Sequence, residues 1–78
     1  MNAGEVFTVA RDIIKESGRK VWVEPVNNDD GGCIIRMNLG DQWIQRSLTT
    51  DDLVTSFDPQ YIVRTTCRQM LSGLLAVR

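Results

Sequence analysis

Residues 20–48, KVWVEPVNNDDGGCIIRMNLGDQWIQRSL, decide the fold of this chain. Apolar and polar side chains alternate along three short runs of this stretch, and a period of two is typical of β-strands with one buried face. Between the runs lie residues 27–32 and 39–41, whose asparagine, aspartate and glycine favour turns. Because these connections are short, the stretch predicts an antiparallel meander with its second strand in the centre.

The alternation also assigns side chains to the two faces of the sheet. The strands are predicted over residues 20–26, 33–38 and 42–48. Pro25 cannot donate a hydrogen bond to a neighbouring strand, so the first strand is expected at an edge of the sheet. In the third strand, Ile44 and Leu48 favour an inward face, although Arg46 then shares that face and Trp43 points away from it.

Helical sequence precedes the strands. Over residues 3–17, apolar side chains recur at spacings of three and four and form one stripe, consisting of Val6, Val9, Ala10, Ile13 and Ile14. Gly18 is placed to end this helix in the left-handed conformation. After the strands, residues 49–57 predict a short turn of helix in which Leu53 and Phe57, four residues apart, share a face.

A second long helix is predicted from Asp58 and Pro59 onward, because aspartate is a favoured N-cap and proline suits the first helical position. Its apolar stripe consists of Val63, Cys67, Met70, Leu71 and Leu74. Gly73 costs a helix about 1 kcal/mol relative to alanine, which indicates close packing at that point. The apolar surface widens over residues 74–77, which predicts that something covers this end.

Together these elements predict an α+β fold: a single compact α-β-β-β-α domain over residues 1–78, a three-stranded antiparallel meander with both helices packed on one face. The expected core consists of Val6, Ala10, Ile13, Val21, Val23, Ile35, Met37, Val63, Cys67, Met70, Leu71 and Leu74. A sheet that is covered on one side only leaves its second face open to water or to a partner.

That open face is the main candidate for a binding site. Trp22, Ile34, Arg36 and Trp43 are predicted to point outward, and tryptophan and arginine are typical of protein-interaction hot spots. The alternative is that one tryptophan packs beneath residues 53–57 or against the last helix.

Charge is distributed unevenly along the chain, although the net charge is only −1. Residues 24–58 contain seven acids and two arginines, a net charge of −5, and would favour a basic partner. The simpler interpretation is a set of solvated loops. Further candidates for electrostatic contacts are Asp29, Asp30, Asp51, Asp52, Arg64 and Arg68.

The residue types argue against catalysis and against a cofactor. The chain contains no histidine to activate a nucleophile, and its paired aspartates fall where turns and helix starts favour aspartate. Neither a zinc site nor a calcium loop is indicated, because the required sets of ligands are missing. Cys33 and Cys67 lie on apolar stripes and are expected to be buried free thiols of a cytoplasmic protein, although a bridge between them is an open alternative. No apolar run is long enough to cross a membrane.

Direct nucleic-acid binding is not expected either. The element order is also that of the double-stranded-RNA-binding domain, whose last helix begins with lysines that contact phosphates. Here that helix begins with Asp58 and offers Arg64 and Arg68 one turn apart, so the resemblance concerns topology alone.

The sequence therefore favours a small, non-enzymatic protein-binding module, and a basic complex that handles nucleic acid is one partner that would suit it. Small chains without motifs are common among accessory proteins of phages and mobile elements, which inhibit a host or defence complex by occupying its surface. This expectation comes from size and not from particular residues. The alternatives are a homo-oligomeric scaffolding protein, such as a homodimer, and a weak nucleic-acid binder.

Overall fold

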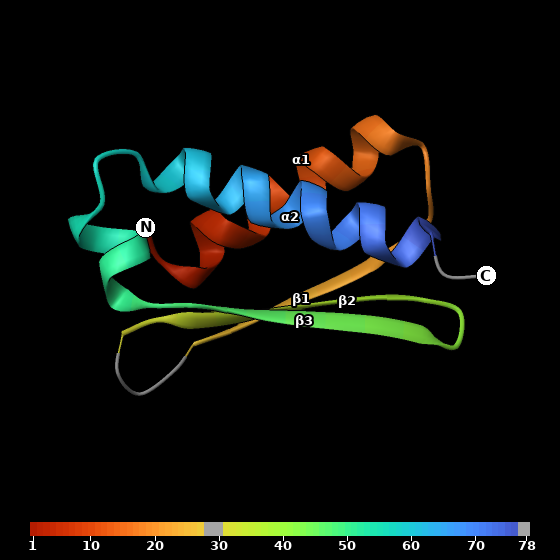
Figure 1. Cartoon of the computed structure of the whole chain (residues 1–78), viewed down its shortest axis with the longest axis horizontal. Helices are drawn as coiled ribbons and strands as arrows, with labels where there is room; N and C mark the ends of the chain where they lie inside the picture. The colour runs from red at the N-terminus through yellow and green to blue at the C-terminus, as the bar shows by residue number, and fades with distance from the viewer. Residues whose placement is uncertain (28–30, 77–78) are drawn as a thin grey trace.

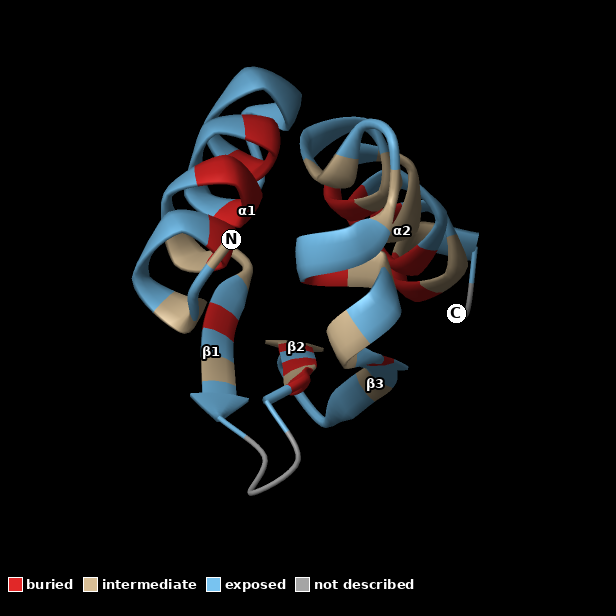
Figure 2. Ribbon diagram, turned by 90° about the vertical axis from the view of Figure 1, so that its left-hand side faces the viewer, coloured by how far each residue is buried: buried red, intermediate tan, exposed pale blue. Residues whose placement is uncertain are grey.

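The computed structural model describes residues 1–27 and 31–76, and its elements follow the predicted order (Figure 1). They are α1 (Ala3–Ser17), β1 (Trp22–Asn27), β2 (Cys33–Leu39), β3 (Gln42–Leu48), the π-helix η1 (Asp51–Thr55) and α2 (Pro59–Ala76). The strands form one antiparallel sheet in the order β1-β2-β3. Figure 2 shows both helices on the same side of this sheet, α1 above β1 and α2 above β3. The fold is thus a single compact α+β domain, as predicted.

The two ends of α1 are fixed by local hydrogen bonds. Asn2 and Glu5 form a capping box: the Glu5 amide donates to Asn2 Oδ1 over 2.9 Å, and the Asn2 amide donates to Glu5 Oε1 over 3.2 Å. At the other end Gly18 has a φ of 71°, the left-handed conformation predicted for it, and its amide donates to the carbonyl of Lys15.

The start of α2 is capped as predicted. The Tyr61 amide donates to Asp58 Oδ1 over 3.1 Å, and Pro59 takes the first helical position. Further along α2, a Cβ built on Gly73 would lie 3.4 Å from Ile44 Cδ1 of β3. The predicted close packing at this glycine is therefore confirmed, and the separation is one that the methyl group of an alanine would also tolerate.

The segment before α2 differs from the prediction. Thr49 Oγ1 and Asp52 Oδ2 each accept the other residue's amide hydrogen, which starts a helical turn as expected of these residue types. However, η1 is a π-helix that ends at Thr55, and Ser56 is extended. The chain therefore leaves the helix before Phe57, whose side chain is fully exposed, so the predicted pairing of Phe57 with Leu53 is wrong.

The core lies between the sheet and the two helices, where Figure 2 places the buried residues. Eleven of the twelve predicted core residues are buried, and the exception, Val21, is partly buried at its margin. Five further residues complete the core: Val9, Ile14, Cys33, Leu48 and Leu53. The widened apolar end of α2 is covered in part by the domain itself, because Leu74 is buried and Leu75 packs against the core, whereas Ala76 is exposed and Val77 lies outside the described residues.

Candidate functional site

The face of the sheet that the helices leave uncovered, here called the outer face, is a grid of three cross-strand rows. Residues paired across an antiparallel sheet point to the same side, so the strand register fixes the rows. In the order β1-β2-β3, they are Trp22-Asn38-Trp43, Glu24-Arg36-Gln45 and Val26-Ile34-Ser47. The four residues predicted for the binding site all lie on this face.

Both tryptophans of this face are exposed. The exposed fraction is 68% for Trp22 and 64% for Trp43, whereas Ile34 is partly buried. The alternative in which one tryptophan packs beneath residues 53–57 or against α2 is therefore wrong. Neither tryptophan can pack against α2, because α2 lies on the opposite face of the sheet (Figure 1). Two large aromatic side chains remain in water in one row.

Arg36 occupies the centre of the grid and is directed toward β3. Its Nε and Nη2 atoms donate to Gln45 Oε1 over 3.3 and 3.2 Å. Its guanidinium carbon also lies 5.9 Å from the centroid of the Trp43 ring, within the range of a cation–π interaction. The central cation is thus held by the β3 half of the outer face.

A shallow depression of about 440 Å³ lies among Trp22, Glu24, Arg36, Asn38 and Trp43. In the part of the chain that the structure describes, the Glu24 carboxylate and the Asn38 side-chain amide make no hydrogen bond or ion pair. The depression therefore combines two aromatic side chains with polar groups that are available to a ligand.

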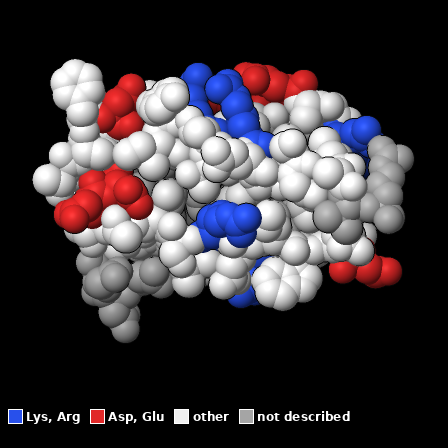
Figure 3. All heavy atoms as spheres, viewed as in Figure 1, with Lys and Arg blue, Asp and Glu red and all other residues white. Residues whose placement is uncertain are grey.

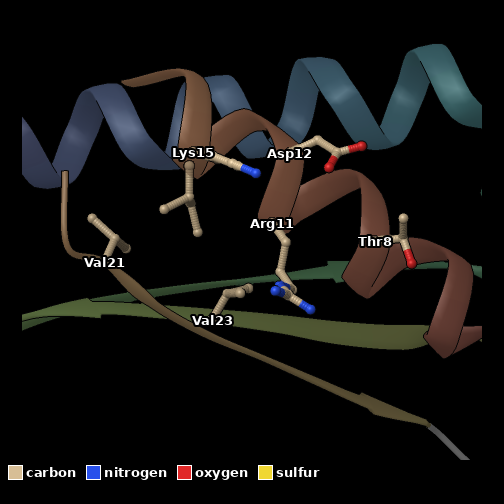
Figure 4. Close-up of a pocket in the computed structure, with 7 residues that line it drawn as sticks. Thr8, Arg11, Asp12, Lys15, Val21 and Val23 are labelled. Atoms are coloured by element: carbon tan, nitrogen blue, oxygen red, sulfur yellow. The ribbon is translucent and has the colours of Figure 1, made fainter. Parts of the chain in front are cut away.

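The two edges of the sheet are less available than its outer face. Pro25 removes one amide donor from β1, and the Arg46 guanidinium covers β3 because Nη1 donates to the Gln45 carbonyl over 2.8 Å. Although the register places Arg46 on the inward side, its side chain is exposed, because β3 is an edge strand. Beside β1, a depression of about 410 Å³ contains the Arg11 side chain, which extends from α1 toward the strand (Figure 4).

The residues predicted for electrostatic contacts do not join this surface. Asp51 and Asp52 belong to η1, where Asp51 Oδ1 accepts from Thr55 Oγ1 over 3.4 Å and Asp52 Oδ2 accepts from the Thr49 amide over 2.9 Å. Figure 3 shows acidic side chains gathered at that end of the molecule. Arg64 and Arg68 are exposed on α2, across the sheet from the tryptophans. The remaining pair, Asp29 and Asp30, lies outside the described residues.

A second group of exposed apolar side chains was not predicted. Val54 is 67% exposed and Tyr61 65% exposed, and they flank the exposed Phe57 near the start of α2. The extended Ser56 conformation turns this segment away from the core. The only sequence signal was the Asp58-Pro59 pair, which marks a break in the helix directly after Phe57.

The two cysteines are free and buried, which confirms the expectation of free thiols over that of a bridge. Burial raises the pKa of Cys33, and burial together with the neighbouring Cys33 raises the pKa of Cys67 to about 12. Thiols held in this protonated form are poor nucleophiles. Among the described residues, no cluster of histidine, cysteine, aspartate or glutamate is arranged to hold a metal ion, and no helix is long and apolar enough to span a bilayer.

No protein-family model, curated protein or solved structure matches the chain.

Proposed function

We propose that this domain is a non-enzymatic protein-binding module and that its contact surface is the outer face of the sheet. The observation that carries the proposal is the row Trp22-Asn38-Trp43, in which both tryptophans are about two-thirds exposed. Tryptophan is enriched where interfaces derive most of their binding energy, and side chains this large are costly to keep in water. Neither tryptophan packs in the core, so the fold gains little from them.

The outer face is favoured over the edges of the sheet. An edge binds a partner by adding a strand, which requires free amide and carbonyl groups along that edge. Pro25 lacks such an amide, and Arg46 occupies the carbonyl of Gln45. The natural contact is therefore with side chains of the outer face.

A different protein is favoured over a second copy of this chain. Two copies that met face to face around a two-fold axis through the centre of the grid would bring Arg36 against its own counterpart. Like charges at the centre of an interface cost several kcal/mol. A partner that has no cation opposite Arg36 can cover the whole outer face without this repulsion.

The charge of the chain suggests the character of this partner. The excess of acids over residues 24–58 would steer a basic protein toward the domain, such as a component of a complex that handles nucleic acid. A module without chemistry of its own acts by occupying a surface. Inhibition of a host or defence complex by a phage or mobile-element accessory protein is the biological role that this mode of action would serve.

The proposal is tested by capturing partner proteins from cell lysate on three immobilised forms of the domain. These are the wild type, the variant Trp22→Ala/Trp43→Ala, and a control variant, Val54→Ala/Tyr61→Ala. The control residues are as exposed as the tryptophans but lie away from the sheet. We expect a partner that is retained by wild type and by the control and lost by the tryptophan variant, with all three folded by circular dichroism. A partner that the tryptophan variant retains and the control loses would move the site to the start of α2 and overturn the proposal.

A further inference from the structure

The two outer strands repeat one arrangement on either side of β2. On β1, Glu24 follows Trp22 by two residues, and on β3, Gln45 follows Trp43 by two residues. Side chains two apart on a strand lie on the same face, about 7 Å apart. Each outer strand thus presents an indole ring beside an oxygen acceptor, and the register places both pairs next to Arg36 and Asn38.

The arrangement on β3 already holds a guanidinium. Arg36 donates twice to the Gln45 amide oxygen and lies 5.9 Å from the Trp43 ring centroid. The planar guanidinium therefore uses the aromatic face and the neighbouring acceptor together, which is how arginine binds best.

Among the described residues, no guanidinium donates to the matching arrangement on β1, although Arg11 lines a depression at the β1 edge together with Trp22 and Glu24. Trp22 is 68% exposed, and the Glu24 carboxylate makes no hydrogen bond or ion pair among the described residues. A carboxylate accepts a hydrogen bond from a guanidinium more strongly than an amide oxygen does. The unoccupied half of the face thus offers a better acceptor than the half that Arg36 occupies.

We infer that Trp22 and Glu24 form a subsite for an arginine side chain of the partner, whose guanidinium lies against the indole ring and donates to the carboxylate. This inference rests on the proposed protein-binding function and names the partner's anchoring residue. Arginine fits better than lysine, because only a planar guanidinium can contact the ring and donate two parallel hydrogen bonds. Arg36 opposes the incoming cation, so its charge lowers the affinity of the subsite.

The test uses N-acetylarginine methylamide as the probe and its neutral citrulline counterpart as the control, titrated at millimolar concentration into ¹⁵N-labelled protein. The chain has two tryptophans, so two indole N–H signals report on the two halves of the face, and Trp22→Phe and Trp43→Phe assign them. We expect the arginine compound to shift the Trp22 signal in a saturable way and the Trp43 signal much less. The citrulline compound should shift neither.

Two charge variants give effects of opposite sign. Glu24→Gln should weaken binding of the arginine compound about two- to fivefold, as expected for loss of one exposed ion pair. Arg36→Gln should strengthen it by a similar factor, because a like charge is removed. Equal shifts with the citrulline compound, or stronger binding by Glu24→Gln than by wild type, would overturn the inference. Either result would reject the arginine subsite alone. The proposed protein-binding function is tested separately, by whether capture of the partner still requires the two tryptophans.

Discussion

Trp22 and Trp43 flank Asn38 in a single cross-strand row, one on each outer strand of the sheet. Both rings point away from the core, and each is about two-thirds exposed. The two largest side chains of the chain therefore contribute little to folding while dominating one surface, which separates the residues of the candidate site from those that stabilise the domain.

Stability measurements should reflect this separation. Trp22→Ala and Trp43→Ala are expected to change the free energy of unfolding by only about 0.5 kcal/mol, since exposed substitutions rarely do more. Ile35→Ala, at a fully buried position of β2, should cost about 2–5 kcal/mol. Urea denaturation followed by circular dichroism measures all three. A loss above 2 kcal/mol for either tryptophan would show that its ring supports the fold.

The edges of the sheet provide a second prediction. Pro25→Val/Arg46→Thr restores an amide to β1 and uncovers the Gln45 carbonyl of β3. Edge-to-edge pairing should then become possible, and sedimentation should detect species above 8.8 kDa that fall apart on dilution. The wild type should stay at the monomer mass under the same conditions. If the double variant also remains a monomer, these two residues do not protect the edges.

The glycine within α2 gives a third prediction, with two substitutions of opposite sign. Alanine at Gly73 would place its Cβ 3.4 Å from Ile44 Cδ1, which flexible side-chain atoms tolerate. Gly73→Ala should therefore raise the free energy of unfolding by up to about 1 kcal/mol through helix propensity. Gly73→Leu should lower it, because the longer side chain must displace Ile44 or separate α2 from β3. Destabilisation by alanine would mean that the helix approaches the sheet too closely for any Cβ.

The buried thiols predict how stability depends on alkaline pH. The pKa of Cys67 rises to about 12 in the folded domain, so above about pH 9 the unfolded chain loses this proton while the folded chain keeps it. Because the unfolded state then binds fewer protons than the folded state, the free energy of unfolding falls as the pH rises, by about 1.4 kcal/mol per pH unit for each such thiol. Urea titrations from pH 8 to 11 measure the slope.

The matched variant for this prediction is Cys67→Ala. It should be less stable at neutral pH because a buried side chain is shortened, yet it should lose stability less steeply above pH 9. An unchanged slope would assign the alkaline loss to other groups.

The sequence predicted the regular elements well because their signals are local. The apolar stripe of α1 and the left-handed Gly18 gave its boundaries as observed, and the alternation in β3 gave those of that strand. It was also correct that Arg46 shares a face with Ile44. The predicted meander also placed this strand at an edge of the sheet, but the sequence did not show that the arginine side chain turns from the inward side into solvent there.

The failures concern properties that depend on three dimensions. The spacing of Leu53 and Phe57 assumes an α-helix, whereas the π-helix η1 ends at Thr55 and sends Phe57 into solvent. The pattern identified Trp22 and Trp43 as residues of one face, but only the packing of α2 on the opposite face shows that nothing in the domain covers them. The sequence could not predict that Arg36 donates to Gln45 and not to Glu24, because all three residues lie in one row and both neighbours offer an oxygen acceptor.

The most direct test of the proposed function is to map the contact surface on the domain itself. Backbone amide signals of ¹⁵N-labelled protein would be followed as the captured partner is added. We expect the largest changes at Trp22, Glu24, Arg36 and Trp43, with the exposed positions of α1 and α2 nearly unchanged. Changes concentrated on the helices or near Phe57, with the outer face unaffected, would contradict the account.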